Sequence, residues 1–193
     1  MAKVTVINNV TLDGVMQAPA RADEDTRGGF AHGGWGAAYQ DPVIARKMGE
    51  LMASSKGSLL FGKRTYLDLY SVWAKATGNP YSAVLNRTHK YVASTTLKEP
   101  LVWENSTLLD GDAADAVAEL KQHGEEDLGI LGSGRLIHSL VRRDLIDEYV
   151  LLIMPIVLGT GLRLFPEGHK VRLRLVESLT STTGVIFARY QAE

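Results

Sequence analysis

The fold of this 193-residue chain is decided by residues 129–137, which have the sequence Gly-Ile-Leu-Gly-Ser-Gly-Arg-Leu-Ile. A short apolar strand passes directly into small residues and then into an amphipathic helix. Such a turn leaves the backbone N–H groups at the helix start uncovered, and these groups attract phosphate. We therefore expect a phosphate-binding turn formed by Gly132, Ser133, Gly134 and Arg135.

A second turn of the same kind lies at residues 60–65, Leu-Phe-Gly-Lys-Arg-Thr. Gly62 allows close backbone approach, and the Thr65 hydroxyl suits a pyrophosphate. Lys63 and Arg64 are cations suited to phosphate oxygens, including the 2′-phosphate that distinguishes NADPH from NADH. Taken alone, either turn is better explained without a ligand, the first as a turn glycine followed by a solvated helix start and the second as a glycine that permits close helix–sheet packing. Two of them together indicate a dinucleotide and hence redox chemistry.

Hydrophobic periodicity predicts alternating strands and helices through the middle of the chain. Strands are expected over 3–10, 57–61, 90–93, 107–109, 128–131 and 146–154, and helices over 42–55, 64–70, 113–123 and 136–141. Alternation from residue 171 and from residue 185, on either side of Thr183-Gly184, predicts a C-terminal antiparallel hairpin. The predicted class is α/β, with a mixed, mainly parallel sheet and helices on both faces.

Residues 17–41 form the irregular part of the chain, with glycines interleaved with aromatic residues. This composition favours a lid-like loop over a plain linker. Trp35 and Tyr39 are candidates to stack on a flat substrate, or else to fill the core beneath the loop. Asp13, in the turn after the first strand, either faces the substrate or bonds its own turn.

Composition excludes several functional classes. The length fits a single domain over residues 1–193, and the net charge of −1 gives no reason to expect nucleic acid. The absence of cysteine excludes disulfides, thiolate metal sites and cysteine nucleophiles, and the five scattered histidines lack zinc-ligand spacing, so no metal is expected. No apolar run approaches the roughly 20 residues needed to cross a bilayer, and the N-terminus has a strand pattern instead of a signal peptide, so we expect no membrane partner and a cytoplasmic location.

Four motifs, in the right order, resemble those of dihydrofolate reductases. Residues 61–66 are similar to their Gly-Arg-Lys-Thr-Tyr/Trp turn, and residues 92–97 to their valine-rich strand followed by Ser-Arg-Thr-Leu. Residues 131–134 resemble their late diglycine turn, and residues 11–14 their Ser-Leu-Asp-Gly turn. Residues 135–165 look closer to the reductase domain of the bifunctional deaminase–reductase of riboflavin synthesis, notably over 144–148 and 155–159.

This resemblance implies a three-layer, dihydrofolate reductase-like fold, NADPH as cofactor and, in the riboflavin branch, often a homodimer. It adds Ser94, Thr95 and Thr96 as residues that reach the ribose phosphate, although family members often have arginine where this chain has Thr95. The expected function is reduction of a small pteridine- or pyrimidine-like heterocycle. The activity would be similar to that of 5-amino-6-(5-phosphoribosylamino)uracil reductase.

Two departures keep alternatives open. Folate reductases carry a lone carboxylate on the first long helix, whereas counting back from Gly62 leads to Arg46, with Asp41 and Glu50 as the nearest acids. Riboflavin reductase domains usually have Glu-Gly-Gly where this chain has Leu-Gly-Ser at 131–133. No catalytic residue is singled out. Dihydrofolate reductase activity, or nucleotide or flavin binding without catalysis, therefore remain as alternatives.

Overall fold

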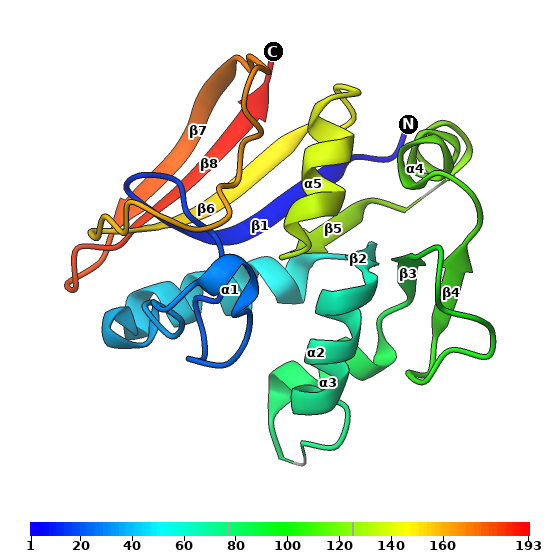
Figure 1. The fold of residues 1–193 in the computed structure, drawn as a ribbon, viewed down its shortest axis with the longest axis horizontal. Coiled ribbons are helices and arrows are strands. Elements are labelled where there is room, and N and C mark those ends of the chain that lie inside the picture. The colour runs from blue at the N-terminus through cyan, green and yellow to red at the C-terminus, as the bar shows by residue number, and fades with distance from the viewer. Residues whose placement is uncertain (77, 125) are drawn as a thin grey trace.

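The computed structural model describes residues 1–76, 78–124 and 126–193. An eight-stranded sheet in the order β4-β3-β2-β5-β1-β6-β8-β7 forms its centre (Figure 1). The strands are β1 (Val4–Thr11), β2 (Ser58–Gly62), β3 (Lys90–Ala93), β4 (Ser106–Leu109), β5 (Leu128–Leu131), β6 (Glu148–Met154), β7 (Leu173–Thr180) and β8 (Ile186–Ala192). All pairs from β4 to β6 are parallel, and β8 and β7 follow as an antiparallel hairpin. The predicted mixed, mainly parallel sheet is confirmed.

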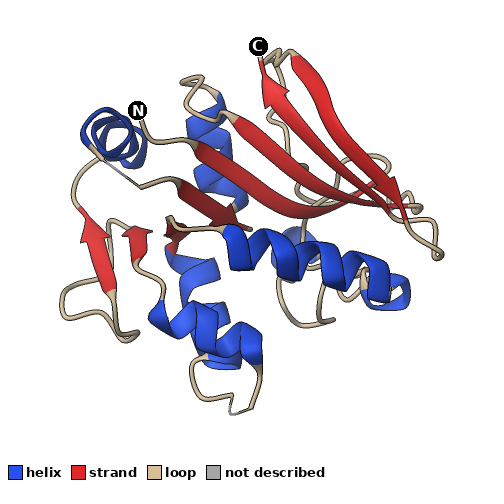
Figure 2. Cartoon of the chain, turned by 180° about the vertical axis from the view of Figure 1, so that it is seen from behind, coloured by secondary structure: helices blue, strands red, loops and turns tan. Residues whose placement is uncertain are grey.

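Helices cover both faces of this sheet, as the views from opposite sides show (Figures 1 and 2). The apolar side chains Val4, Val6 and Val10 of β1 pack into one core cluster with residues of α4 and α5. The opposite face carries α1 and, further along the sheet, α2 and α3. The helices are α1 (Pro42–Ser54), α2 (Lys63–Trp73), α3 (Pro80–Arg87), α4 (Ala113–His123) and α5 (Gly134–Val141). Within the described ranges, none of them combines the length and apolar character that crossing a membrane would require.

Helices α1, α3 and α4 begin at a residue whose side chain caps the first turn. Asp41 accepts from the Val43 N–H, and Asp112 accepts from two N–H groups of the first turn of α4. Both starts were predicted. Helix α3 was not predicted, although Asn79 caps it and Pro80 follows, which repeats the Asp41-Pro42 signal. Helix α2 also extends to Trp73, three residues beyond the predicted end at residue 70.

The predicted irregular segment 17–41 contains only two short 3₁₀ turns, Arg27–Gly29 and Ala37–Tyr39. The buried side chain of Gln17 organises it: Nε2 donates to the carbonyls of Asp25 and Arg27, and Oε1 accepts from the Leu162 N–H. An ion pair between Arg21 and Asp68 then ties the segment to α2. These contacts place the segment beside the start of α2, where one of the two glycine turns lies.

Candidate functional site

The two glycine turns lie next to each other at the carboxyl edge of the sheet. Strands β2 and β5 are parallel neighbours, and β1 lies on the other side of β5. In Figure 1 the ends of these strands meet the starts of α2 and α5. Ligands of open α/β sheets bind at this edge, outside the carboxyl ends of the strands.

A direct hydrogen bond joins the two turns. The Gly62 N–H donates to Ser133 Oγ at 2.9 Å. Thr65, from the first turn of α2, lies against the other turn, because a Cβ on Gly132 would come within 3.2 Å of Thr65 Cγ2. Gly132 also has a φ of 68°, which favours glycine. The contact and the backbone together explain why residue 132 has no side chain.

The N–H groups at the start of α5 have no side-chain cap. Ser133 is the N-cap residue, with φ 66° and ψ 50°, and its side chain makes no capping hydrogen bond. Its hydroxyl bonds Gly62 instead. The first N–H groups of an α-helix have no partner within the helix and attract anions, but Gly134 and Leu136, which carry two of these groups in α5, are buried. A Cβ on Gly134 would meet Leu162 Cδ2 at 2.5 Å, which shows how closely the β6–β7 connection approaches this turn.

Cationic and hydroxyl groups gather at the ends of β2 and β3. Lys63 Nζ donates to Thr96 Oγ1 at 2.6 Å, and Ser94 Oγ accepts from the backbone N–H groups of Thr96 and Leu97. The Arg64 side chain is 60% exposed and lies 4.0 Å from Asp25. Thr95 is exposed. The structure therefore joins the two predicted segments through one contact, between the exposed Lys63 ammonium group and Thr96.

Arg135 is also exposed, on the outer side of α5. It lines an open hollow of about 410 Å³ together with Asp112 at the start of α4 and Arg142, the residue that follows α5. Its neighbours therefore differ from those of Lys63, and a contact between Arg135 and the cofactor stays a prediction.

The Asp13 carboxylate braces the turn after β1. It accepts from the Thr11 hydroxyl at 2.6 Å and from the backbone N–H groups of Leu158 (3.2 Å) and Gly159 (2.8 Å). The Thr11 hydroxyl, followed by these backbone donors, lowers the pKa of Asp13 to about 2 against the cost of burial. Asp13 thus performs the turn role that the sequence left open, and a substrate contact stays a prediction.

Trp35 packs beneath the irregular segment. It is 7% exposed, belongs to the core cluster of Val15 and Phe30, and donates its indole N–H to the Gln17 carbonyl at 2.7 Å. This is the core-filling alternative of the sequence analysis. Tyr39 is half-buried against the same cluster. Stacking of either ring on a substrate stays a prediction.

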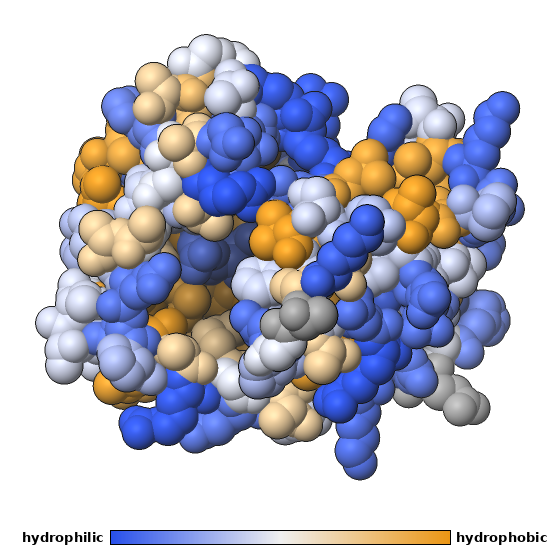
Figure 3. All heavy atoms as spheres, turned by 90° about the horizontal axis from the view of Figure 1, so that it is seen from below, coloured by the Kyte–Doolittle hydropathy of each residue, from blue (hydrophilic) through white to orange (hydrophobic). Residues whose placement is uncertain are grey.

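The face covered by α1 contains a hollow. Figure 3 shows it on the underside of the molecule, with apolar atoms in its depth, in the half where Figure 1 places α1 and segment 17–41. Arg46 and Glu50 are exposed on α1. Asp41 accepts from the Thr182 hydroxyl at 2.6 Å as well as from the helix start, and these hydrogen bonds lower its pKa. Of the two acids nearest the expected position, Asp41 is therefore occupied in capping, and Glu50 is exposed.

Two polar residues of β1 were not singled out by the sequence analysis. Asn8 is 8% exposed, and its Oδ1 accepts from the Gly132 N–H at 3.1 Å. Asn9 is half-buried on the neighbouring position, and alternation along the strand places it on the same face as Ile7, toward the cluster beneath α1. The available signal was two polar residues near the carboxyl end of an otherwise apolar strand.

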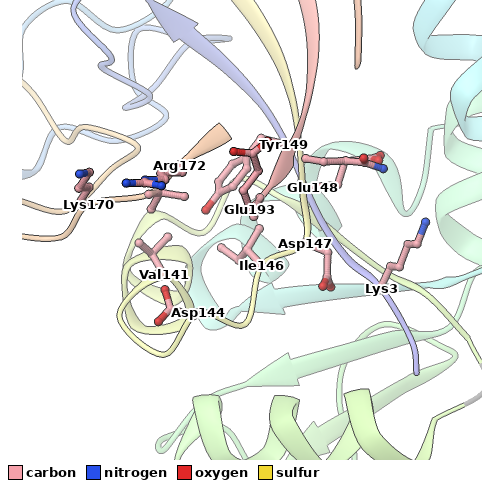
Figure 4. Close-up of a pocket in the computed structure, with 13 residues that line it drawn as sticks. Lys3, Val141, Asp144, Ile146, Asp147, Glu148, Tyr149, Lys170, Arg172 and Glu193 are labelled. Atoms are coloured by element: carbon pink, nitrogen blue, oxygen red, sulfur yellow. The ribbon is translucent and has the colours of Figure 1, made fainter. Parts of the chain in front are cut away.

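A cavity of about 420 Å³ lies at the opposite, amino edge of the sheet (Figure 4). Tyr149 lies at its centre, and burial raises the pKa of this phenol to about 12. The acids Asp147 and Glu148 that line it are held by Lys121 and Arg189, at 2.6 and 2.9 Å. Because no strand-to-helix glycine turn lines it, the carboxyl edge is the stronger candidate site. The described residues contain no cluster of potential metal ligands.

Comparisons with known proteins place the chain in a family. The Bacillus subtilis (strain 168) proteins YyaP and YwjB, both uncharacterised, are related in sequence. YyaP is 26% identical over 135 residues, covering 67% of this chain and 70% of YyaP. YwjB is 34% identical over 73 residues, covering 37% of this chain and 42% of YwjB.

Solved structures share the fold. The crystal structure of a putative riboflavin biosynthesis protein from Shewanella sp. PV-4 aligns over 100% of this chain and 99% of its own, with a TM-score of 0.74 and 26% identity. A pyrimidine reductase-like protein from Corynebacterium diphtheriae aligns over 100% and 92%, with a TM-score of 0.67 and 12% identity, and so shows the fold alone. The expected resemblance and fold class are confirmed. Because the family model of the RibD C-terminal domain matches residues 2–187, this chain belongs to that family.

Proposed function

We propose that this protein is an NADPH-dependent reductase that transfers a hydride to a small pteridine- or pyrimidine-like heterocycle. The observation that carries the proposal is the hydrogen bond between Gly62 and Ser133, which joins two phosphate-binding turns at neighbouring strand ends. Family membership supports a reductase-like role, and the similar Shewanella protein is described as a putative riboflavin biosynthesis protein.

The residues at the edge of the sheet fit a dinucleotide that lies across β3, β2, β5 and β1. The uncapped start of α5 suits the pyrophosphate. Lys63 and Thr96, which are already in contact, suit the 2′-phosphate, and Arg64 is exposed beside them. The adenosine half would thus lie over β2 and β3, and the nicotinamide half over β5 and β1.

Bound NADPH would supply the hydride, and the protein would hold the ring against the substrate in a dry cleft. Reduction of a C=N or C=O bond also consumes one proton. Asp13 and Asp41 have lowered pKa values and accept hydrogen bonds from N–H and O–H groups, so neither holds a proton to give. We infer that water supplies the proton, with NADP⁺ and the reduced heterocycle as products.

A pyrimidine bearing a phosphoribosyl group is the preferred substrate within this class. Arg46 occupies the position expected for the folate carboxylate, is exposed on α1, and makes no ion pair within residues 1–76, 78–124 and 126–193. Two other arginines of this region, Arg21 and Arg27, are paired with Asp68 and Asp25. Arg46 is therefore the cation available to the phosphate end of such a substrate.

Oxidation of NADPH in the presence of candidate substrates tests the proposal. The ribosylamino-pyrimidine phosphate should be reduced, with dihydrofolate as the comparison substrate. Saturable NADPH binding without turnover of any pteridine or pyrimidine would refute the enzymatic role and leave a binding protein. An absorption spectrum of the purified protein that shows bound flavin would refute NADPH as the resident cofactor. The expected homodimer stays a prediction that light scattering would check.

A further inference from the structure

The side chain of Asn8 contains a polar group whose role the fold does not explain. Its Oδ1 accepts from the Gly132 N–H, whereas its Nδ2 is closed to water and, across the parts of the chain that the structure describes, has no hydrogen-bond partner. Buried polar groups are nearly always hydrogen-bonded, because water can no longer satisfy them. An unpartnered amide in a strand therefore points to a partner that the protein itself does not provide.

The orientation of this amide is fixed by its neighbour. A backbone N–H can only donate, so the Gly132 N–H requires Oδ1 to face it and directs Nδ2 to the other side of the carboxamide. If Asn8 served only to hold Gly132, an acceptor such as aspartate or serine would suffice. The donor on the same side chain has no function in that account.

The unpartnered donor lies beside other free donors. Ser133 leaves the N–H groups of the first turn of α5 without a side-chain cap. Gly132, which donates to Asn8, and the following Ser133 both have left-handed backbone conformations. A ligand with several oxygens would satisfy the helix N–H groups and the amide at once.

We propose that Asn8 contacts the nicotinamide-side half of the bound dinucleotide, with Nδ2 donating a hydrogen bond to a ligand oxygen and Oδ1 holding the 132–134 turn. The inference rests on the proposed function and deepens it. The half is assigned by strand order: Lys63 and Thr96 bind the adenosine side over β2 and β3, and Asn8 lies two strands away from β2, on β1. Because Nδ2 is closed to water in the ligand-free chain, binding of the dinucleotide must expose it.

The test distinguishes the donor Nδ2 of Asn8 from its acceptor Oδ1. It also distinguishes the nicotinamide half of the ligand from the adenosine half. Asn8→Asp keeps an acceptor and removes the donor, and Asn8→Leu removes both at similar volume. Each is titrated with NADPH and with 2′,5′-ADP, which carries only the adenosine half. We expect both variants to bind NADPH about ten- to a hundredfold more weakly and 2′,5′-ADP within about threefold of wild type.

The control is Ser58→Ala, which removes another buried polar side chain, at the amino end of β2, where its Oγ donates to Glu126. Its two affinities should match those of wild type. Wild-type NADPH affinity in Asn8→Asp, or equal losses for both ligands in both variants, would overturn the role of Asn8 while leaving the proposed function intact. Wild-type protein that binds neither ligand would overturn the proposed function, and this inference with it. If Asn8→Leu does not fold, Asn8→Asp carries the test.

Discussion

The two glycine turns at the carboxyl edge of the sheet differ in backbone and in charge. In the β2–α2 turn, Gly62 has an ordinary φ of −82°, and the exposed cations Lys63 and Arg64 follow it. In the β5–α5 turn, Gly132 and Ser133 are both left-handed, and the buried Asn8 side chain lies beneath them. The first turn offers charge on mobile side chains, and the second offers a fixed backbone shape.

This difference indicates how one edge of a sheet can bind two chemically different parts of a ligand. A cation on a long side chain recognises charge and tolerates variation in position. Backbone N–H groups at a helix start require the ligand to fit the turn. We therefore expect substitutions in the first turn to change which cofactor is chosen, and substitutions in the second to change whether the turn forms at all.

The largest expected effect comes from removing both cations of the first turn. Lys63→Ala combined with Arg64→Ala should weaken NADPH binding at least about a hundredfold, because each charge-assisted hydrogen bond contributes about 1.5–3 kcal/mol. NADH lacks the 2′-phosphate, so its affinity should change by about threefold or less. Fluorescence titration with both nucleotides measures the two losses.

Arg172→Ala is the control for loss of surface charge, because this arginine lines the cavity at the amino edge. Both affinities of the control should match wild type. Equal losses for NADPH and NADH in the double variant would show that Lys63 and Arg64 do not recognise the 2′-phosphate. The proposed difference in function between the two turns would then be wrong.

The next effect contrasts the two glycines. Gly132→Ala should lower the free energy of unfolding by about 1–2 kcal/mol, because alanine is strained at a φ of 68° and its Cβ would crowd Thr65. In Gly62→Ala the Cβ would meet Ser133 at an ordinary 3.7 Å, so stability should change by about 0.5 kcal/mol or less. Urea unfolding of both variants checks the contrast, which similar losses would contradict.

Much of the fold was predictable because its signals are local. Asp41 and Asp112 cap their helices through N–H groups within three residues, and both helix starts follow from the sequence. Helix α3 shows the limit of this reading. Its Asn79-Pro80 signal has the same form, and its apolar periodicity is comparable to that of α1 and α4, but with only eight residues the helix is shorter than either.

The candidate site was predictable in part, for the same reason. Each glycine turn is a short run of sequence and can be recognised locally. The resemblance to a family whose motifs occur in the same order then assigned both turns to one site. The role of Asn8 depends on a partner 124 residues away, and Gln17 bonds Leu162 across 145 residues. Only the parallel pairing of β1 with β5 and β6 brings such residues together, so no local pattern reports them.

The smallest expected effect is a pH dependence of stability at Asp13, which braces the turn after β1. Asp13 has a pKa of about 2 in the folded protein and 3.8 as its ordinary value, so the unfolded chain binds more protons in this range. The stability that Asp13 contributes is therefore present above about pH 4 and lost as the pH falls toward 2.

Asp13→Asn should accordingly be less stable than wild type near neutral pH, and the difference should shrink between pH 4 and 2. Urea unfolding across this range measures it. Asp13 bonds the β6–β7 connection, which approaches Gly134 in the β5–α5 turn. Because 2′,5′-ADP has only the adenosine half, which we assign to the β2–α2 turn, Asp13→Asn should leave the affinity for 2′,5′-ADP unchanged. A stability difference that is constant with pH would contradict this assignment.

The most direct test of the central claim is the equilibrium binding of NADPH to the wild-type protein, followed by nucleotide fluorescence and by titration calorimetry. If the two turns hold one dinucleotide between them, one NADPH should bind per chain, more tightly than either 2′,5′-ADP or reduced nicotinamide mononucleotide alone. The absence of saturable binding at concentrations up to about 1 mM, the upper end of ordinary enzyme affinities, would contradict the account.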